Sequence, residues 1–188
     1  LTAPGVTSYG AVWVGFPVLR QCFTEYVGWT QTTNNPSESD LYRIVTKDNG
    51  YVLDGKVLPF DTRTEVIKVR EANGQMRDVS MTVRSTKHGP IVAERMGAPI
   101  AMRVAALDRP RLFEQFWKMG LAKNFTEWDA AMRMQQLPIF NTAYADRDGH
   151  FGYVYNSTLW AHSTGDYRFW QGVVPGDRSD LIATEIVP

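Results

Sequence analysis

Short runs of alternating apolar and polar residues dominate the middle of the chain, over residues 41–94. The clearest run is residues 78–84, where every second side chain is apolar, as in a strand that buries one face. Asn-Gly and Asp-Gly pairs separate these runs, at residues 49–50, 54–55 and 73–74. Because such pairs favour the tight turns of β-hairpins, the pattern predicts a meander of short antiparallel strands.

Further strands are expected on either side of this meander. Residues 9–18 and 26–33 are rich in aromatic and β-branched side chains, which pack well in sheets. Residues 99–107 form a more apolar run directly after the meander. Residues 139–145 and 151–155 flank an Asp-Gly pair, so they predict a further hairpin.

Two helices are predicted between these strands. Residues 111–119 carry their apolar side chains at helical spacing. The second helix begins at Asn124 or at Thr126, where Thr126 and Asp129 resemble a capping box. Pro138 ends it, because proline cannot continue a helix.

This order of elements predicts a β-rich α+β fold in one domain. The two helices fall within residues 111–136, and the Gly-, Ser- and Asp-rich residues 161–188 read as an irregular tail. The chain begins at Leu1 rather than Met, and we expect it to be a fragment of a longer protein.

Composition excludes several classes of protein. Of 188 residues, 44% are apolar and 12% aromatic, enough for a sizeable core. Twenty basic and 20 acidic residues give zero net charge, which disfavours a nucleic-acid groove or a surface for anionic membranes. No run of about 18 apolar residues predicts a membrane span. A single cysteine, Cys22, excludes an internal disulfide.

The residues alone assign no chemistry. The three histidines lack the spacing of a zinc site, and no cysteine pair accompanies them. Residues 146–149 resemble the start of a calcium loop, but Ser157 stands where such a loop needs a glutamate. A hairpin turn is therefore the expected role of that segment.

A series of motifs changes this picture. In chain order they are Pro4-Gly5 with Tyr9-Gly10, Gly28-Trp29 with Asp40-Leu41-Tyr42, Thr86-x-His88-Gly89-Pro90-Ile91-Val92, Asn124-Phe-x-Glu127-Trp128, Asn141 with Tyr144-Ala145-Asp146, and Pro175-Gly176-Asp177. In this order they resemble the large catalytic chain of the penicillin acylase family of N-terminal-nucleophile hydrolases. The resemblance spans nearly the whole sequence.

The resemblance implies both a fold and a reaction. The fold would be part of an αββα sandwich with an inserted antiparallel β subdomain. Residues 1–40 and 137–160 would supply the core sheet strands of the sandwich, and residues 41–107 a β-rich excursion from that core. The reaction would be hydrolysis of an amide bond in a small acylated substrate, such as a penicillin-type β-lactam or an acyl-homoserine lactone. In this family the nucleophile is the N-terminal residue of a self-processed chain, usually Ser. Its own α-amino group is the base, which is reasonable because such a group titrates at about pH 8.

Several residues match functional positions of the family. Asn141 matches the asparagine whose side-chain amide stabilises the oxyanion, and Thr33 matches the position whose backbone N–H is the second donor. Gln31 stands where some relatives have His, and a catalytic positioning role is expected for it. Phe140 and Trp29 flank these positions as candidates for the substrate pocket, although core packing is the alternative for both, and the stronger one for Trp29.

The resemblance also points to a structural calcium ion, since some members bind one near the segment that matches Ser37–Asp40. Asp40 fits a ligand position, whereas Ser37 replaces a carboxylate, and no cofactor is required for the reaction. The partners implied are the substrate, the missing remainder of the catalytic chain with its nucleophile, and the smaller chain of the processed precursor. The location implied is the bacterial periplasm or outside the cell.

Two other functions stay open at this point. The chain could be a non-catalytic binding or structural β-domain that kept the scaffold without the nucleophile. It could also be a calcium-dependent interaction module. Without a nucleophilic residue at its start, the fragment is expected to be inactive by itself.

Overall fold

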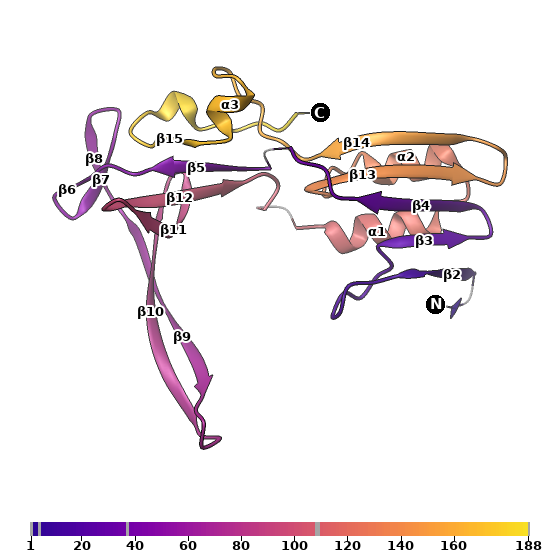
Figure 1. Ribbon diagram of the computed structural model, residues 1–188, viewed down its shortest axis with the longest axis horizontal. Coiled ribbons are helices and arrows are strands. Elements are labelled where there is room, and N and C mark those ends of the chain that lie inside the picture. The colour runs from indigo at the N-terminus through magenta and orange to yellow at the C-terminus, as the bar shows by residue number, and fades with distance from the viewer. Residues whose placement is uncertain (1, 4, 37, 108–109, 188) are drawn as a thin grey trace. The chain divides into compact units, whose positions relative to one another are not determined.

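A computed structural model describes residues 2–3, 5–36, 38–107 and 110–187. They form two compact units, which share no sheet and have separate cores (Figure 1). Unit 1 comprises Leu1–Glu38, Ala105–Trp160 and Ile186–Pro188, and unit 2 comprises Ser39–Val104 and Ala161–Glu185. The described residues contain no helix long and apolar enough to cross a membrane.

Unit 1 is built on one antiparallel six-stranded sheet. The strands, in spatial order, are β1 (Thr2–Ala3), β2 (Val6–Ala11), β3 (Gln21–Thr24), β4 (Val27–Thr32), β13 (Ile139–Asp146) and β14 (Phe151–Ser157). Strand β4, from the start of the sequence, thus lies beside a hairpin that comes more than a hundred residues later. This pairing brings the predicted site segments together.

Helices α1 (Leu112–Leu121) and α2 (Phe125–Met132) pack on one face of this sheet (Figure 1). The core between them combines Trp29 and Tyr144 from the strands with Phe116, Met119 and Trp128 from the helices. The buried Gln115 links the helices, because its amide donates to the Met132 carbonyl and accepts from the Gln136 backbone.

The opposite face of the sheet is open and aromatic. Because side chains alternate along a strand, the residues paired across neighbouring strands share this face. Five of its side chains are between 58% and 88% exposed: Tyr9, Phe23, Phe151, Tyr153 and Tyr155. We call this surface the open aromatic face.

Unit 2 contains two sheets. The larger, in spatial order, has β15 (Val173–Pro175), β5 (Ser39–Arg43), β12 (Ala98–Val104), β11 (Gly89–Arg95), β10 (Met76–Thr86) and β9 (Asp61–Arg70), with only β15 and β5 parallel. The smaller has β6 (Thr46–Lys47), β7 (Gly50–Leu53) and β8 (Lys56–Pro59). Figure 1 shows β9 and β10 as a long hairpin that extends away from the rest of the unit.

The expected turns form where local sequence demands them. Asp48 and Asn49, with φ of 50° and 63°, make the two-residue turn between β6 and β7. Asp54 and Gly55, with φ of 51° and 74°, do the same between β7 and β8. Asn, Asp and Gly tolerate this left-handed conformation best, so the predicted hairpins are confirmed, as is the β-rich α+β fold. The expected meander is not continuous, because its strands divide between two sheets and β5 pairs with β12.

Several expectations of the sequence analysis are wrong in detail. Helix α2 ends at Met132, well before Pro138, so the proline does not end it. The strand expected over residues 9–18 ends at Ala11, since Gly15 and Pro17 lie in the turn that follows it. The tail is not wholly irregular, because it contains α3 (Tyr167–Trp170), β15 and a 3-10 turn, Ser179–Leu181. Its apolar anchors, among them Trp170, Val174 and Leu181, pack into the core of unit 2.

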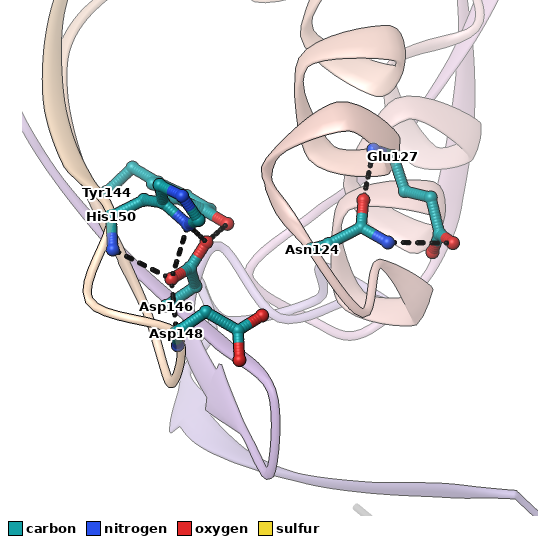
Figure 2. Close-up of polar contacts among 6 residues, drawn as sticks. All are labelled: Asn124, Glu127, Tyr144, Asp146, Asp148 and His150. Atoms are coloured by element: carbon teal, nitrogen blue, oxygen red, sulfur yellow. Dashed lines mark hydrogen bonds and ion pairs between the residues drawn. The ribbon is translucent and has the colours of Figure 1, made fainter.

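The start of α2 is decided between the two alternatives in favour of Asn124. Its side chain accepts a hydrogen bond from the Glu127 backbone N–H at 2.9 Å, and the Glu127 carboxylate accepts from the Lys123 N–H in return. Figure 2 shows the contacts between Asn124 and Glu127. The expected Thr126–Asp129 box does not form, because Thr126 already lies inside the helix.

We expect Asn124→Ala to lower the free energy of unfolding by about 1 kcal/mol, since the first turn of α2 loses its cap. Chemical denaturation would measure the change. Asn124→Asp is the matched control, because aspartate caps helices as well as asparagine does and should retain most of the stability. Equal losses for the two variants would contradict a capping role.

Candidate functional site

Asn141 lies on β13 at the centre of the sheet of unit 1. The pairing register places it between Thr32 of β4 and Tyr155 of β14. Its side chain is half-buried and belongs to the open aromatic face, because its neighbours Phe140 and Thr142 are buried on the other face. The predicted oxyanion asparagine is therefore accessible from outside the sheet.

The amide of Asn141 points at the backbone of Thr33. Its Nδ2 donates to Thr32 Oγ1 at 3.2 Å and to the Thr33 carbonyl oxygen at 3.4 Å. A carbonyl oxygen only accepts, so this contact fixes which end of the amide carries the N–H groups. The Tyr153 hydroxyl donates to Asn141 Oδ1 from the other side. The structure thus brings Asn141 and Thr33 together.

Gln31 and Trp29 point to the opposite face. Both are buried, at 3% and 4% exposure, beneath the helices. Trp29 donates from its indole nitrogen to the Arg20 carbonyl at 2.9 Å and belongs to the core of unit 1, as the packing alternative expects. Gln31 donates to the Thr142 hydroxyl at 3.4 Å. Neither side chain shares the open aromatic face with Asn141.

Phe140 is also buried, and its backbone is unusual. Its φ is 133°, within the region that favours glycine. The ring lies against Trp13, with centroids 6.0 Å apart, and the Arg20 guanidinium carbon lies 4.2 Å from the centre of each ring. Phe140 is therefore enclosed, and its neighbourhood is cationic as well as aromatic.

Sequence reasoning missed two residues that contact the site. The sequence predicts Tyr153 only as part of a strand. Alternation along β14 nevertheless places its side chain on the same face of the sheet as Asn141. The sequence around Asn34 is typical of a turn, yet the buried side chain of Asn34 accepts a hydrogen bond from the Phe140 backbone of β13. The alternation along β14 was a usable signal for Tyr153, whereas nothing local indicates the contact of Asn34.

Asp146 closes the hairpin that carries Asn141. Its carboxylate accepts from the Asp148 and His150 backbone N–H groups at 3.0 and 2.9 Å, and from the Tyr144 hydroxyl at 2.9 Å (Figure 2). Burial alone would raise the pKa of Asp146, but these bonds and the His150 ring together lower it. The carboxylate is fully used by the turn, as expected for a hairpin rather than a calcium loop.

Asp40, the candidate calcium ligand, is buried in unit 2. Its Oδ2 accepts from His162 Nε2 at 2.9 Å and from the Tyr42 hydroxyl at 3.3 Å, while Oδ1 has no hydrogen-bond partner among the described residues. Calcium needs six or more oxygen ligands, and an imidazole is a poor one. No group of three or more His, Cys, Asp or Glu in the described residues could hold a metal. Ser37 lies outside the described residues.

This donor set around Asp40 fits calcium poorly, so no step of the reaction is assigned to an ion here. Burial raises the pKa of Asp40, although hydrogen bonds from His162 and Tyr42 and the charge of Arg103 oppose the shift. The His162 ring also stacks on Trp170, with centroids 3.6 Å apart. Through the contact between Asp40 and His162, β5 is joined to the segment that follows residue 160 within unit 2.

Comparison with known proteins identifies the family of this chain. The penicillin amidase family model matches residues 1–188, so the chain belongs to the penicillin amidase family. The acyl-homoserine lactone acylase PvdQ of Pseudomonas fluorescens is 32% identical over 165 residues, which are 82% of this chain and 21% of that protein. PvdQ of Pseudomonas putida is 29% identical over 170 residues, or 85% of this chain and 22% of that protein.

A solved structure confirms the fold. Thermostable penicillin G acylase from Alcaligenes faecalis superposes with a TM-score of 0.82 at 23% identity, covering 100% of this chain and 34% of that chain. The relatives are acylases, and the chain spans about a fifth of the length of the curated proteins it matches. Activity and substrate of the whole protein are therefore matters for proposal.

The buried His88 predicts a pH dependence of stability. Burial and the nearby charge of Arg103 lower its pKa to about 4. In the unfolded chain the pKa of a histidine is about 6.5. Between about pH 6.5 and 4 the unfolded chain therefore binds a proton at His88 that the folded protein does not bind. The stability contributed by neutral His88 is thus complete above about pH 6.5 and is lost as pH falls towards about 4.

The measurement is the melting temperature of the wild type and His88→Gln across this window. We expect the variant to lose less stability than the wild type between about pH 6.5 and 4, because it has no imidazole to protonate. Asp40 has the opposite effect on the pH dependence of stability, since its raised pKa favours the folded state as pH falls. Parallel curves for the two proteins would contradict this role of His88.

Proposed function

We propose that these residues belong to an acylase that hydrolyses the amide bond of a small acylated substrate, with Asn141 and Thr33 as its oxyanion hole. The observation that carries the proposal is the position of the Asn141 amide, 3.4 Å from the Thr33 carbonyl oxygen on an accessible face. Membership of the penicillin amidase family and the two acylase relatives support it.

The reaction proceeds through an acyl-enzyme on an N-terminal Ser that lies outside this chain. The Ser hydroxyl attacks the amide carbon, and its proton passes to the α-amino group of the same residue. The carbonyl oxygen then becomes an oxyanion, which the Asn141 side-chain N–H and the Thr33 backbone N–H stabilise. Collapse breaks the C–N bond, the proton goes to the leaving nitrogen, and water releases the acyl group.

The Asn141 amide is suited to this role because its hydrogen bonds fix its direction before substrate arrives. Its two N–H contacts, at 3.2 and 3.4 Å, are long, so exchanging one of them for a developing negative charge is favourable. The Tyr153 hydroxyl binds the oxygen end of the amide, so the nitrogen end is the one held beside Thr33, where an N–H can be exchanged to the substrate. Such preorganised donors are a major source of catalysis in acyl transfer.

The remainder of the catalytic chain and the smaller chain of the precursor would cover the open aromatic face and complete the acyl pocket. Five aromatic side chains there are more than half exposed, which is unusual unless another surface packs on them. The substrate is an acyl-homoserine lactone, as the names of the PvdQ relatives suggest, or a penicillin-type β-lactam. A periplasmic or extracellular location rests on the family resemblance alone.

In the full-length protein, Asn141→Ala should lower kcat by about 10²–10³-fold with a smaller effect on KM, because one oxyanion donor is lost. Asn141→Asp should be at least as impaired, since it replaces the donor by an acceptor of the same shape. Asn124→Ala is the control, because it weakens a distant helix cap and should leave kcat unchanged. Near-normal turnover of Asn141→Ala would exclude it from the oxyanion hole.

N-terminal sequencing of the expressed full-length protein tests the nucleophile. A mature chain that begins with Ser, Cys or Thr a few tens of residues before Leu1 is expected, since self-processing creates the catalytic α-amine. A single uncleaved chain would instead favour a non-catalytic binding or structural domain on the same scaffold.

A further inference from the structure

Asn34 connects the two halves of the proposed oxyanion hole. It follows Thr33 in the chain, after the end of β4, and only 9% of its surface is exposed. Its Oδ1 accepts from the Phe140 backbone N–H at 2.8 Å, and its Nδ2 donates to the Asn156 backbone carbonyl at 2.7 Å. Both contacts are short, and both reach residues more than a hundred positions away in sequence.

The two backbone groups that Asn34 binds belong to residues that face each other. Phe140 on β13 pairs with Asn156 on β14, and opposite residues of an antiparallel pair commonly exchange such N–H and C=O groups. A side-chain amide offers the same acceptor and donor as a peptide group. Asn34 therefore acts as an extra peptide unit between the two strands at this point.

The backbone conformation at Phe140 depends on such support. A phenylalanine with a φ of 133° is strained, and strain of this kind persists only where the surroundings hold it. Trp13 and Arg20 hold the ring, and Asn34 holds the backbone N–H. Because Asn141 is the next residue, the conformation of Phe140 sets the direction in which the Asn141 side chain leaves the strand.

We propose that Asn34 is a positioning residue that sets the separation between the two oxyanion donors. It is bonded covalently to Thr33, which supplies the backbone donor, and it holds the residue before Asn141, which supplies the amide. One side chain thus fixes both donors relative to each other. This inference rests on the proposed function, and it adds a residue that touches no reacting atom.

The inference predicts a defect in turnover rather than in binding. In the full-length protein, Asn34→Ala should lower kcat by about 10–10²-fold, because a donor misplaced by about 1 Å loses much of its effect. KM should change little, since the open aromatic face and the acyl pocket stay intact. A change in KM with normal kcat would overturn the proposal.

Asn34→Asp provides a second variant of nearly the same shape. It keeps an acceptor for the Phe140 N–H but loses the donor to Asn156, so its kcat should lie between those of the wild type and Asn34→Ala. Where Asn34→Ala does not fold, Asn34→Asp carries the test, and a normal kcat for it overturns the proposal. The control is Thr158→Val, which removes a buried hydroxyl that binds the Gln135 and Leu137 carbonyls nearby. It should lower the melting temperature and leave kcat unchanged.

A double-mutant cycle with Asn141→Ala separates positioning from general destabilisation. If Asn34 acts through Asn141, adding Asn34→Ala to Asn141→Ala should lower kcat by less than about threefold further. An equal loss in both backgrounds would overturn the role of Asn34 and leave the oxyanion hole standing. A normal kcat for Asn141→Ala alone would overturn the oxyanion hole itself, and the proposal for Asn34 with it.

Discussion

The register between β4 and β13 is the constraint on which the site depends. Asn141 faces Thr32, so every second residue on each strand is committed to one side of the sheet. Trp29 and Gln31 then lie beneath the helices, and Thr32 and Asn141 lie on the open aromatic face. A shift of β13 by one residue would bury the Asn141 amide and expose the core residue Tyr144, so core packing and the site select the same register.

The core enforces this register more strongly than the site could. Trp29 packs with Phe116, Met119 and Trp128, and burying such side chains contributes several kcal/mol, about 1.5–3 for each large apolar residue. Two long hydrogen bonds from Asn141 contribute far less. The helices α1 and α2 therefore determine where the amide points, although they lie on the opposite face of the sheet.

Most of the secondary structure could be predicted because its signals are local. The left-handed turns at Asp48–Asn49 and Asp54–Gly55, the alternation in β10 and the helical spacing in α1 each depend on a few neighbouring residues. The structure of the tail, residues 161–188, was harder to predict from the sequence. Its apolar residues stand among glycines and polar residues, and they are fixed by packing into the core of unit 2. Its strand β15 forms only by pairing with β5, which is distant in sequence.

The site shows the same division between local and distant causes. Asn141 and Thr33 were assigned by family resemblance, and the structure brings them together, although their catalytic roles stay predictions. The positive φ of Phe140 has no local signal, since phenylalanine disfavours it and the contacts with Trp13, Arg20 and Asn34 that support it come from elsewhere in the chain. The sequence predicts only a turn role for Asn34, because the residues that its side chain binds are remote in sequence.

The open aromatic face links stability and catalysis in the proposed enzyme. An oxyanion donor is more effective where water is excluded, because a low dielectric strengthens its interaction with the developing charge. Asn141 shares its face with Tyr153 and Tyr155, which are 63% and 60% exposed. A surface that packs on these rings would remove apolar area from water and dry the surroundings of Asn141 at the same time. The interaction that would stabilise the assembled catalytic chain is thus the one that would make its oxyanion hole effective.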